Sequence, residues 1–253
     1  MPSLTLPSCL LASNGRHVQI LDLATSLVER SLVEPGNSIS AFTLSGSDIE
    51  KVYVALSSRS VQCYDWTTGD KVGDAKKYSG DIHSLSAFSS DDEADVLVAV
   101  VRTEAGWQIL VGDQPIFTTK DALSNLQVLG DYIVAASTSK LVVARRLPTK
   151  DTEVPVKYDA LEIKIPSGVT CLDARVQRID APKKKGRPEE ELTVAVGNTN
   201  GEIFVYEDVF SAIRPAEVSV TPRTLHWHRE AVGSVKWSRD GKCEQTQSVR
   251  SSS

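Results

Sequence analysis

The sequence predicts an all-β fold built from repeated units of short antiparallel strands, and three observations lead to this prediction. Residues 51–72 contain two apolar strands joined by a short polar link. The second of these strands ends at Asp65, and an earlier strand ends at Asp22, 43 residues before it. Similar strand–turn–strand segments recur along most of the 253 residues. A repeat of this length that is made of strands indicates a β-propeller.

The end of the second strand in residues 51–72 carries the most specific motif. Tyr64 and Asp65 close the strand, and Thr68 and Gly69 follow three residues later. An aromatic–Asp pair at a strand end, followed by a Thr-Gly turn, is typical of one blade of a WD repeat. Gly69 also frees the backbone at the point where the chain must reverse. We therefore expect a four-stranded blade here.

Five such blades can be placed in order along the chain, and one further strand follows them. Asn14-Gly15, a strong hairpin dipeptide, forms a turn in the first blade. No sequence remains for the innermost strand of this blade. In the fifth blade, Tyr206 and Glu207 occupy the place of the Trp-Asp pair. The predicted blades and the last strand cover residues 8–33, 38–72, 82–118, 123–165, 169–228 and 232–237.

The repeat pattern stops after residue 241. The remaining sequence, CEQTQSVRSSS, has no alternation and little apolar content, so we expect no strand there. The predicted domains are a partial WD-repeat propeller over residues 1–241 and a disordered tail over residues 242–253. Five blades and one strand predict a fragment, or a truncated gene product, of a larger protein.

The composition limits the kinds of partner that we expect the protein to bind. A net charge of −5 argues against nucleic-acid binding by the whole surface but permits a local basic patch. The four cysteines lie far apart in the sequence and form no metal-binding or redox motif. No apolar run approaches the roughly 20 residues that cross a bilayer, so we expect an intracellular protein with no membrane partner.

The sequence also lacks the patterns of an enzyme. It contains no nucleophile elbow, phosphate-binding loop or dinucleotide-binding glycine motif. His17 and His83 each stand alone, and His226 and His228 lack the further ligands that a metal ion needs. We predict no catalytic residues, no metal, no cofactor and no small-molecule substrate.

Six residues occupy positions that WD repeats use for structure. His228 stands where these repeats carry a histidine that forms hydrogen bonds within the blade, although Trp227 replaces the usual preceding glycine. The partner aspartate of that network is missing from two strand links, where Ser58 and Asn200 stand. We therefore expect divergent repeats held mainly by packing. The six positions are Asp22, Tyr64, Asp65, Tyr206, His228 and Asp240.

An insertion at residues 178–191 carries the strongest charge feature of the sequence. Lys183, Lys184, Lys185 and Arg187 precede three glutamates. One interpretation is an exposed loop between two strands, because charge runs are usually solvated. The other is a nuclear-import signal or a contact to RNA phosphates.

The repeats resemble those of WD40 proteins over residues 8–241, and the most specific stretch is LHWHREAVGSVKWSRDG at residues 225–241. Its Leu-His-Trp-His start, a Val four residues on and its Ser-x-Asp-Gly close resemble the WD repeat 75 family. The fungal members of that family are U-three-snoRNA-associated subunits of the small-subunit processome.

This resemblance implies a non-enzymatic scaffold in the t-UTP subcomplex that supports pre-rRNA transcription and early 18S rRNA processing in the nucleolus, within the nucleus. The implied partners are other t-UTP and processome proteins, with pre-rRNA and snoRNA in the same complex. It also implies that the chain is most of the N-terminal propeller of a two-propeller protein. The alternative is a generic WD-repeat adaptor, such as a substrate receptor of a ubiquitin ligase or a subunit of a trafficking coat.

Overall fold

The computed structural model describes residues 3–5, 9–33, 35–89, 94–147, 156–166, 168–178, 190–209, 221–226, 229–238 and 243–248. Every regular element in these residues is a β-strand. Within the same ranges there is no helix long and apolar enough to cross a membrane. The chain divides into two compact units, Met1–Lys120 and Asp121–Ser253, and each is described separately.

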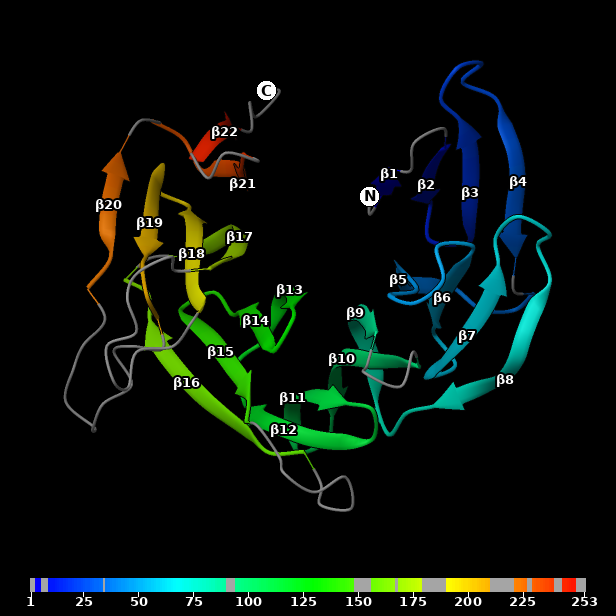
Figure 1. Ribbon diagram of the computed structural model, residues 1–253, viewed down its shortest axis with the longest axis horizontal. Coiled ribbons are helices and arrows are strands. Elements are labelled where there is room, and N and C mark those ends of the chain that lie inside the picture. The colour runs from blue at the N-terminus through cyan, green and yellow to red at the C-terminus, as the bar shows by residue number, and fades with distance from the viewer. Residues whose placement is uncertain are drawn as a thin grey trace. The chain divides into compact units, whose positions relative to one another are not determined.

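The first unit contains three four-stranded antiparallel sheets, in each of which every strand pairs with its neighbours in the sequence (Figure 1). The first sheet is β1 (Ser3–Thr5), β2 (Cys9–Ser13), β3 (His17–Asp22) and β4 (Val28–Val33). The second is β5 (Ile39–Leu44), β6 (Lys51–Leu56), β7 (Ser60–Asp65) and β8 (Lys71–Lys77). The third is β9 (Asp81–Ser89), β10 (Asp95–Thr103), β11 (Gly106–Val111) and β12 (Gln114–Thr119).

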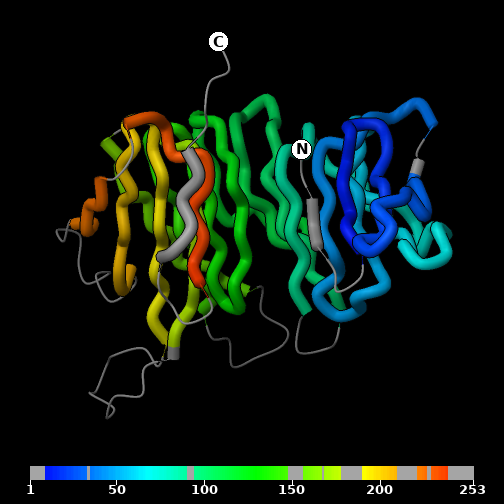
Figure 2. Tube along the Cα trace, turned by 90° about the horizontal axis from the view of Figure 1, so that it is seen from above, coloured from blue at the N-terminus to red at the C-terminus, as the bar shows by residue number. Residues whose placement is uncertain are grey.

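The second unit contains two more four-stranded sheets and one pair of strands. The fourth sheet is β13 (Ser124–Leu129), β14 (Tyr132–Ala136), β15 (Lys140–Arg146) and β16 (Tyr158–Lys164). The fifth is β17 (Val169–Arg178), β18 (Glu190–Asn198), β19 (Glu202–Tyr206) and β20 (Arg223–His226). The sixth consists of β21 (Val232–Trp237) and β22 (Cys243–Ser248). Figure 2 shows neighbouring strands running side by side, alternately up and down.

The core of the first unit lies between its sheets. Val52 and Val54 of β6 pack with β2 and β3 of the first sheet, whereas Ala55 of the same strand packs with β9 and β10 of the third sheet. All three side chains are fully buried. A sheet that is covered on both faces explains why β6 and β10 are continuous apolar runs.

The second unit repeats this arrangement. One core cluster lies between the fourth and fifth sheets and contains Leu141, Val194 and Tyr206. A smaller cluster joins the fifth sheet to β21 through Ala195 and Val232. The fifth sheet is therefore apolar on both faces, as a sheet inside a stack of sheets must be.

The five four-stranded antiparallel sheets confirm the fold class that the repeat pattern predicts. The turn after Asp65 has the predicted glycine at Gly69, whose positive φ of 87° is a conformation that glycine adopts at little cost. The insertion predicted at residues 178–191 is shorter at its ends, because Arg178 pairs with Glu190 in the ladder between β17 and β18. Residues 179–189 lie outside the described part of the chain.

Two strand predictions were wrong. The first sheet has its fourth strand, since β1 pairs with β2 through Ser3 and Ala12, and three residues are enough to extend the ladder. Residues 243–248 form β22, which pairs with β21 although its sequence is polar. Hydrogen bonds of the ladder come from the backbone, and a strand at a sheet edge needs few apolar side chains. Residues 249–253 are not described, so the predicted domain limits stay predictions.

Candidate functional site

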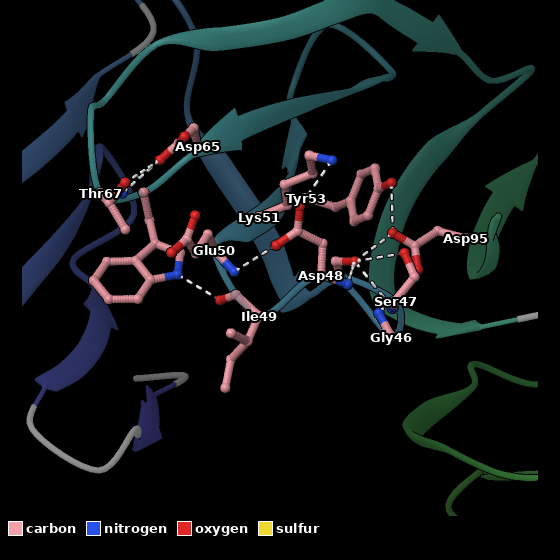
Figure 3. A network of polar contacts seen from close by, with 12 residues as sticks. Gly46, Ser47, Asp48, Ile49, Glu50, Lys51, Tyr53, Asp65, Thr67 and Asp95 are labelled. Atoms are coloured by element: carbon pink, nitrogen blue, oxygen red, sulfur yellow. Dashed lines mark hydrogen bonds and ion pairs between the residues drawn. The ribbon is translucent and has the colours of Figure 1, made fainter. Parts of the chain in front are cut away.

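The carboxylate of Asp95, at the start of β10, accepts hydrogen bonds from the neighbouring sheet, mostly from the loop between β5 and β6 (Figure 3). Asp95 accepts hydrogen bonds from the hydroxyl groups of Ser45 at 2.5 Å and of Tyr53 at 2.8 Å. The backbone N–H groups of Gly46 and Ser47 donate to its other oxygen at 3.0 Å each. The network fixes the loop between β5 and β6 against the third sheet.

The electrostatics of Asp95 follow from this geometry. Partial burial raises the pKa of the carboxyl, but the hydrogen bonds from Ser45, Tyr53 and Ser47 stabilise the charged form more and hold the pKa below its usual value. Burial, together with the neighbouring Asp95 charge, raises the pKa of the Tyr53 phenol, which therefore stays a donor. The network is thus complete whenever Asp95 is ionised.

The same loop is also held on its other side, by the turn that follows β7. The indole N–H of Trp66 donates to the carbonyl oxygen of Ile49 at 2.7 Å, and its backbone N–H donates to that of Glu50 at 2.9 Å. Asp48 and Lys51 close the loop with an ion pair at 2.9 Å. Contacts on both sides give the loop a fixed conformation at the surface of the first unit.

Asp22 and Asp65 lie at equivalent turns of the first and second sheets, between the third and fourth strands. The carboxylate of Asp65 accepts from the backbone N–H groups of Thr67 and Thr68 and from the Thr67 hydroxyl. Asp22 does the same with Ala24 and Thr25. These hydrogen bonds lower the pKa of both carboxyls. Both predicted positions thus hold a turn in place.

The two tyrosines among the predicted positions fill cores. Tyr64 packs between the first and second sheets, and Tyr206, which is fully buried, packs between the fourth and fifth. Burial raises the pKa of Tyr206 to about 12, so its phenol is neutral. The remaining predicted residues lie outside the described part of the chain, and their roles stay predictions. They are His228, Asp240, Lys183, Lys184, Lys185 and Arg187.

A second carboxylate joins three sheets in the second unit. Asp173 of β17 accepts from the side-chain amide of Gln127 at 2.9 Å, from the Lys236 ammonium at 3.2 Å and from the Trp237 backbone N–H at 2.8 Å. The guanidinium of Arg175 lies 4.3 Å from the centroid of the Trp237 ring. β13, β17 and β21 are therefore tied together by one polar cluster.

Asp95 and Asp173 are not among the residues that the sequence pattern predicts. Neither follows an aromatic residue at a strand end, which is the motif that located Asp65. Asp95 begins an apolar strand, and Asp173 lies within a strand that contains several apolar residues. A carboxylate that is partly buried in such a place needs hydrogen-bond partners. That signal could have marked them as contacts between sheets, although not which sheets they join.

The structure places the cysteine and histidine side chains that a metal site or a nucleophilic site would use. The described residues contain no group of three or more His, Cys, Asp or Glu side chains that could hold a metal ion. An open cleft of about 280 Å³ beside Asp95 is lined by Cys63 and Lys76, but burial raises the pKa of the Cys63 thiol. A protonated thiol is a poor nucleophile. His83 packs against Trp107 with ring centroids 4.4 Å apart, and His226 is exposed on β20.

No family model and no curated protein matches this chain. Solved structures do match it. A crystal structure of BBS1N in complex with ARL6DN, soaked with lead, superposes with a TM-score of 0.62 at 13% identity, over 92% of this chain and 67% of that chain. The Neurospora crassa Pan2 WD40 domain superposes with a TM-score of 0.55 at 12% identity, over 95% of this chain and 69% of that chain. At these identities the likeness concerns the fold, and the chain has the fold of a WD40-like β-propeller.

Proposed function

We propose that this chain is a non-enzymatic scaffold that binds other proteins in the small-subunit processome. The observation that supports the specific assignment is the motif at residues 225–241, which resembles the WD repeat 75 family and lies in a chain with a WD40-like fold. In this role the chain supports pre-rRNA transcription and early 18S rRNA processing in the nucleolus. Its partners are other t-UTP and processome proteins, with pre-rRNA and snoRNA in the complex.

The geometry of the polar clusters favours a binding role over catalysis. Asp95 and Asp173 accept hydrogen bonds from loops and strands of the protein itself. Such clusters fix the shape of a surface, and loops that a rigid scaffold holds in place commonly carry binding residues. A scaffold needs this rigidity because ordering a loop during binding would weaken the complex.

The test is the location and RNA association of the tagged chain. We expect nucleolar staining, and we expect pre-rRNA to be enriched in the purified complex relative to messenger RNA. An unrelated tagged propeller is the control for non-specific recovery of abundant RNA. Cytoplasmic staining without pre-rRNA would refute the processome assignment.

The second candidate is a protein–protein adaptor outside ribosome biogenesis. It is favoured by one observation, that the matching BBS1N structure is a complex with another protein, ARL6DN. In that case the tagged chain would be cytoplasmic and would be recovered with subunits of a ubiquitin ligase or a trafficking coat. The same purification therefore separates the two candidates.

The basic insertion has its own expected result under the proposed function. Replacing Lys183, Lys184 and Lys185 with Ala removes three positive charges from a run of four basic residues within five positions. We expect less of the protein in the nucleus and less crosslinking to pre-rRNA, since import signals and phosphate contacts both depend on these charges. Replacing Glu189, Glu190 and Glu191 with Gln is the matched control. Unchanged location and crosslinking in the lysine variant would leave only the interpretation of a solvated loop.

A further inference from the structure

Exposed apolar side chains gather on one edge of the first unit. The described residues include six large hydrophobic side chains that are exposed, and four of them lie in the turn between β3 and β4, at the start of β4, and in the loop between β5 and β6. Leu27 is 67% exposed and Ile49 is 60% exposed, so neither side chain belongs to a core. Single exposed aliphatic residues are common, but a group of them marks a binding surface. We call the group the apolar rim: Leu23, Leu27, Val28, Ile49 and the partly exposed ring of Trp66.

Two hydrogen bonds link the strands and turns that carry the apolar rim. Ile49 lies in the loop between β5 and β6 and accepts the indole hydrogen bond of Trp66. Thr67, the next residue, accepts a hydrogen bond at its carbonyl oxygen from Arg30, two residues beyond Val28 on β4. The turn between β7 and β8 therefore contacts both β4 and the β5–β6 loop.

The loops that carry the apolar rim are acidic. They contain six carboxylates against three basic side chains, an excess of three negative charges. Hydrogen bonds within the turns lower the pKa of Asp22 and Asp65, and the hydrogen bond from Lys51 lowers the pKa of Asp48, so these carboxylates are ionised at neutral pH. The acidic residues are Asp22, Glu29, Asp48, Glu50, Asp65 and Asp70, and the basic ones are Arg30, Lys51 and Lys71.

We propose that the apolar rim docks a basic amphipathic segment of a partner protein. The aliphatic side chains of that segment cover Leu27, Ile49 and Trp66, and its Lys and Arg side chains face the carboxylates around the rim. This partner fits because an apolar surface bordered by negative charge is complementary to apolar residues flanked by positive charge. The inference rests on the proposed scaffold function and adds to it the surface and the chemistry of the partner.

The loops are suited to this task because they are already ordered. Trp66 and Ile49 are joined by a hydrogen bond, and Asp95 fixes the other end of the same loop through Ser45 and Ser47. A surface that is rigid before binding avoids the cost of ordering its side chains. Aromatic residues such as Trp66 commonly anchor peptide segments in interfaces.

The probe for this surface is a labelled synthetic amphipathic peptide of leucine and lysine, whose binding to the full chain is followed by fluorescence anisotropy. Two comparison peptides separate the contributions. One has glutamate in place of lysine, and the other has serine in place of leucine. We expect the leucine–lysine peptide to bind, the leucine–glutamate peptide not to bind, and the lysine–serine peptide to bind at least about tenfold more weakly.

Variants locate the binding on the apolar rim. Leu27→Ser combined with Ile49→Ser is expected to weaken binding of the leucine–lysine peptide by about tenfold or more. Both side chains are exposed, so the variant keeps its fold, and unchanged circular dichroism confirms this. Leu147→Ser is the matched control, because Leu147 is an exposed leucine of the second unit, and binding should not change. Glu50→Gln with Asp70→Asn should weaken binding and reduce its dependence on salt.

Three results would overturn the inference. They are equal binding by the Leu27→Ser, Ile49→Ser variant, equal binding of the leucine–glutamate peptide, and a dimer of the chain that the double variant abolishes. The last result would make a second copy the occupant of the rim. The function is tested separately by pre-rRNA recovery. If the wild-type chain recovers pre-rRNA but does not bind the peptide, only the docking role of the apolar rim is rejected. If it binds the peptide but does not recover pre-rRNA, only the processome role is rejected.

Discussion

Replacing Gly197 with Ala is expected to lower the free energy of unfolding of the second unit by about 3 kcal/mol, because the added methyl group has no room. A Cβ atom at this position would lie 2.6 Å from the Cys171 sulfur and 2.7 Å from a methyl carbon of Val232. Real Cβ atoms do not come this close to other heavy atoms, so either β18 or β21 must move. Cys171 and Thr170 also bind the carbonyl oxygen of Val232, and a shift of β21 would strain these contacts as well.

Urea unfolding of the wild type and three variants measures this effect. Val232→Ala alone removes buried methyl groups and is expected to cost about 2 kcal/mol. The double variant removes the contact with the Val232 methyl carbon but keeps the Val232 Cβ at 2.8 Å and the Cys171 sulfur at 2.6 Å. It relieves part of the clash, so the losses of the two single variants should sum to more than the loss of the double variant. Additive losses would mean that the Val232 methyl carbon does not limit the size of the side chain at position 197.

The strands were predictable from the sequence where apolar residues form a clear local pattern. Val52, Val54 and Ala55 are buried on the two faces of β6, as an apolar run in a doubly covered strand requires. Asp22 and Asp65 were predicted because each ends a strand, and the structure shows that their partners lie two or three residues away, in the same turn. These interactions depend on short sequence separation, which a sequence displays directly.

The missed features depend on neighbours that are distant in the sequence. Asp95 meets the loop at Ser45, 50 residues earlier, and Asp173 meets Trp237, 64 residues later. Gly197 stands at the end of an apolar run, and nothing in that run shows that β21 passes close to it. β22 was missed for another reason, since its polar side chains hide a strand that is held by backbone hydrogen bonds.

Replacing Asp95 with Ala is expected to lower the free energy of unfolding of the first unit by about 3 kcal/mol, because four donors lose their acceptor at once. The donors are the hydroxyls of Ser45 and Tyr53 and the backbone N–H groups of Gly46 and Ser47. Asp113→Ala is the matched control. That carboxylate is 87% exposed and forms a surface ion pair with Lys76, so its loss should cost less than about 1 kcal/mol.

Asp95→Asn separates the charge of the side chain from its shape. The amide oxygen still accepts from Gly46 and Ser47, and the hydroxyls of Ser45 and Tyr53 can turn to accept from the amide nitrogen, so we expect a loss of about 1 kcal/mol at neutral pH. The pKa of Asp95 is lowered in the folded state, so its charge stabilises the fold above the unfolded pKa of about 4. This stabilisation is lost as the pH falls through the lowered folded-state pKa. The stability difference between wild type and Asp95→Asn should therefore shrink on acidification below about pH 4, and a difference independent of pH would show that the charge of Asp95 does not contribute.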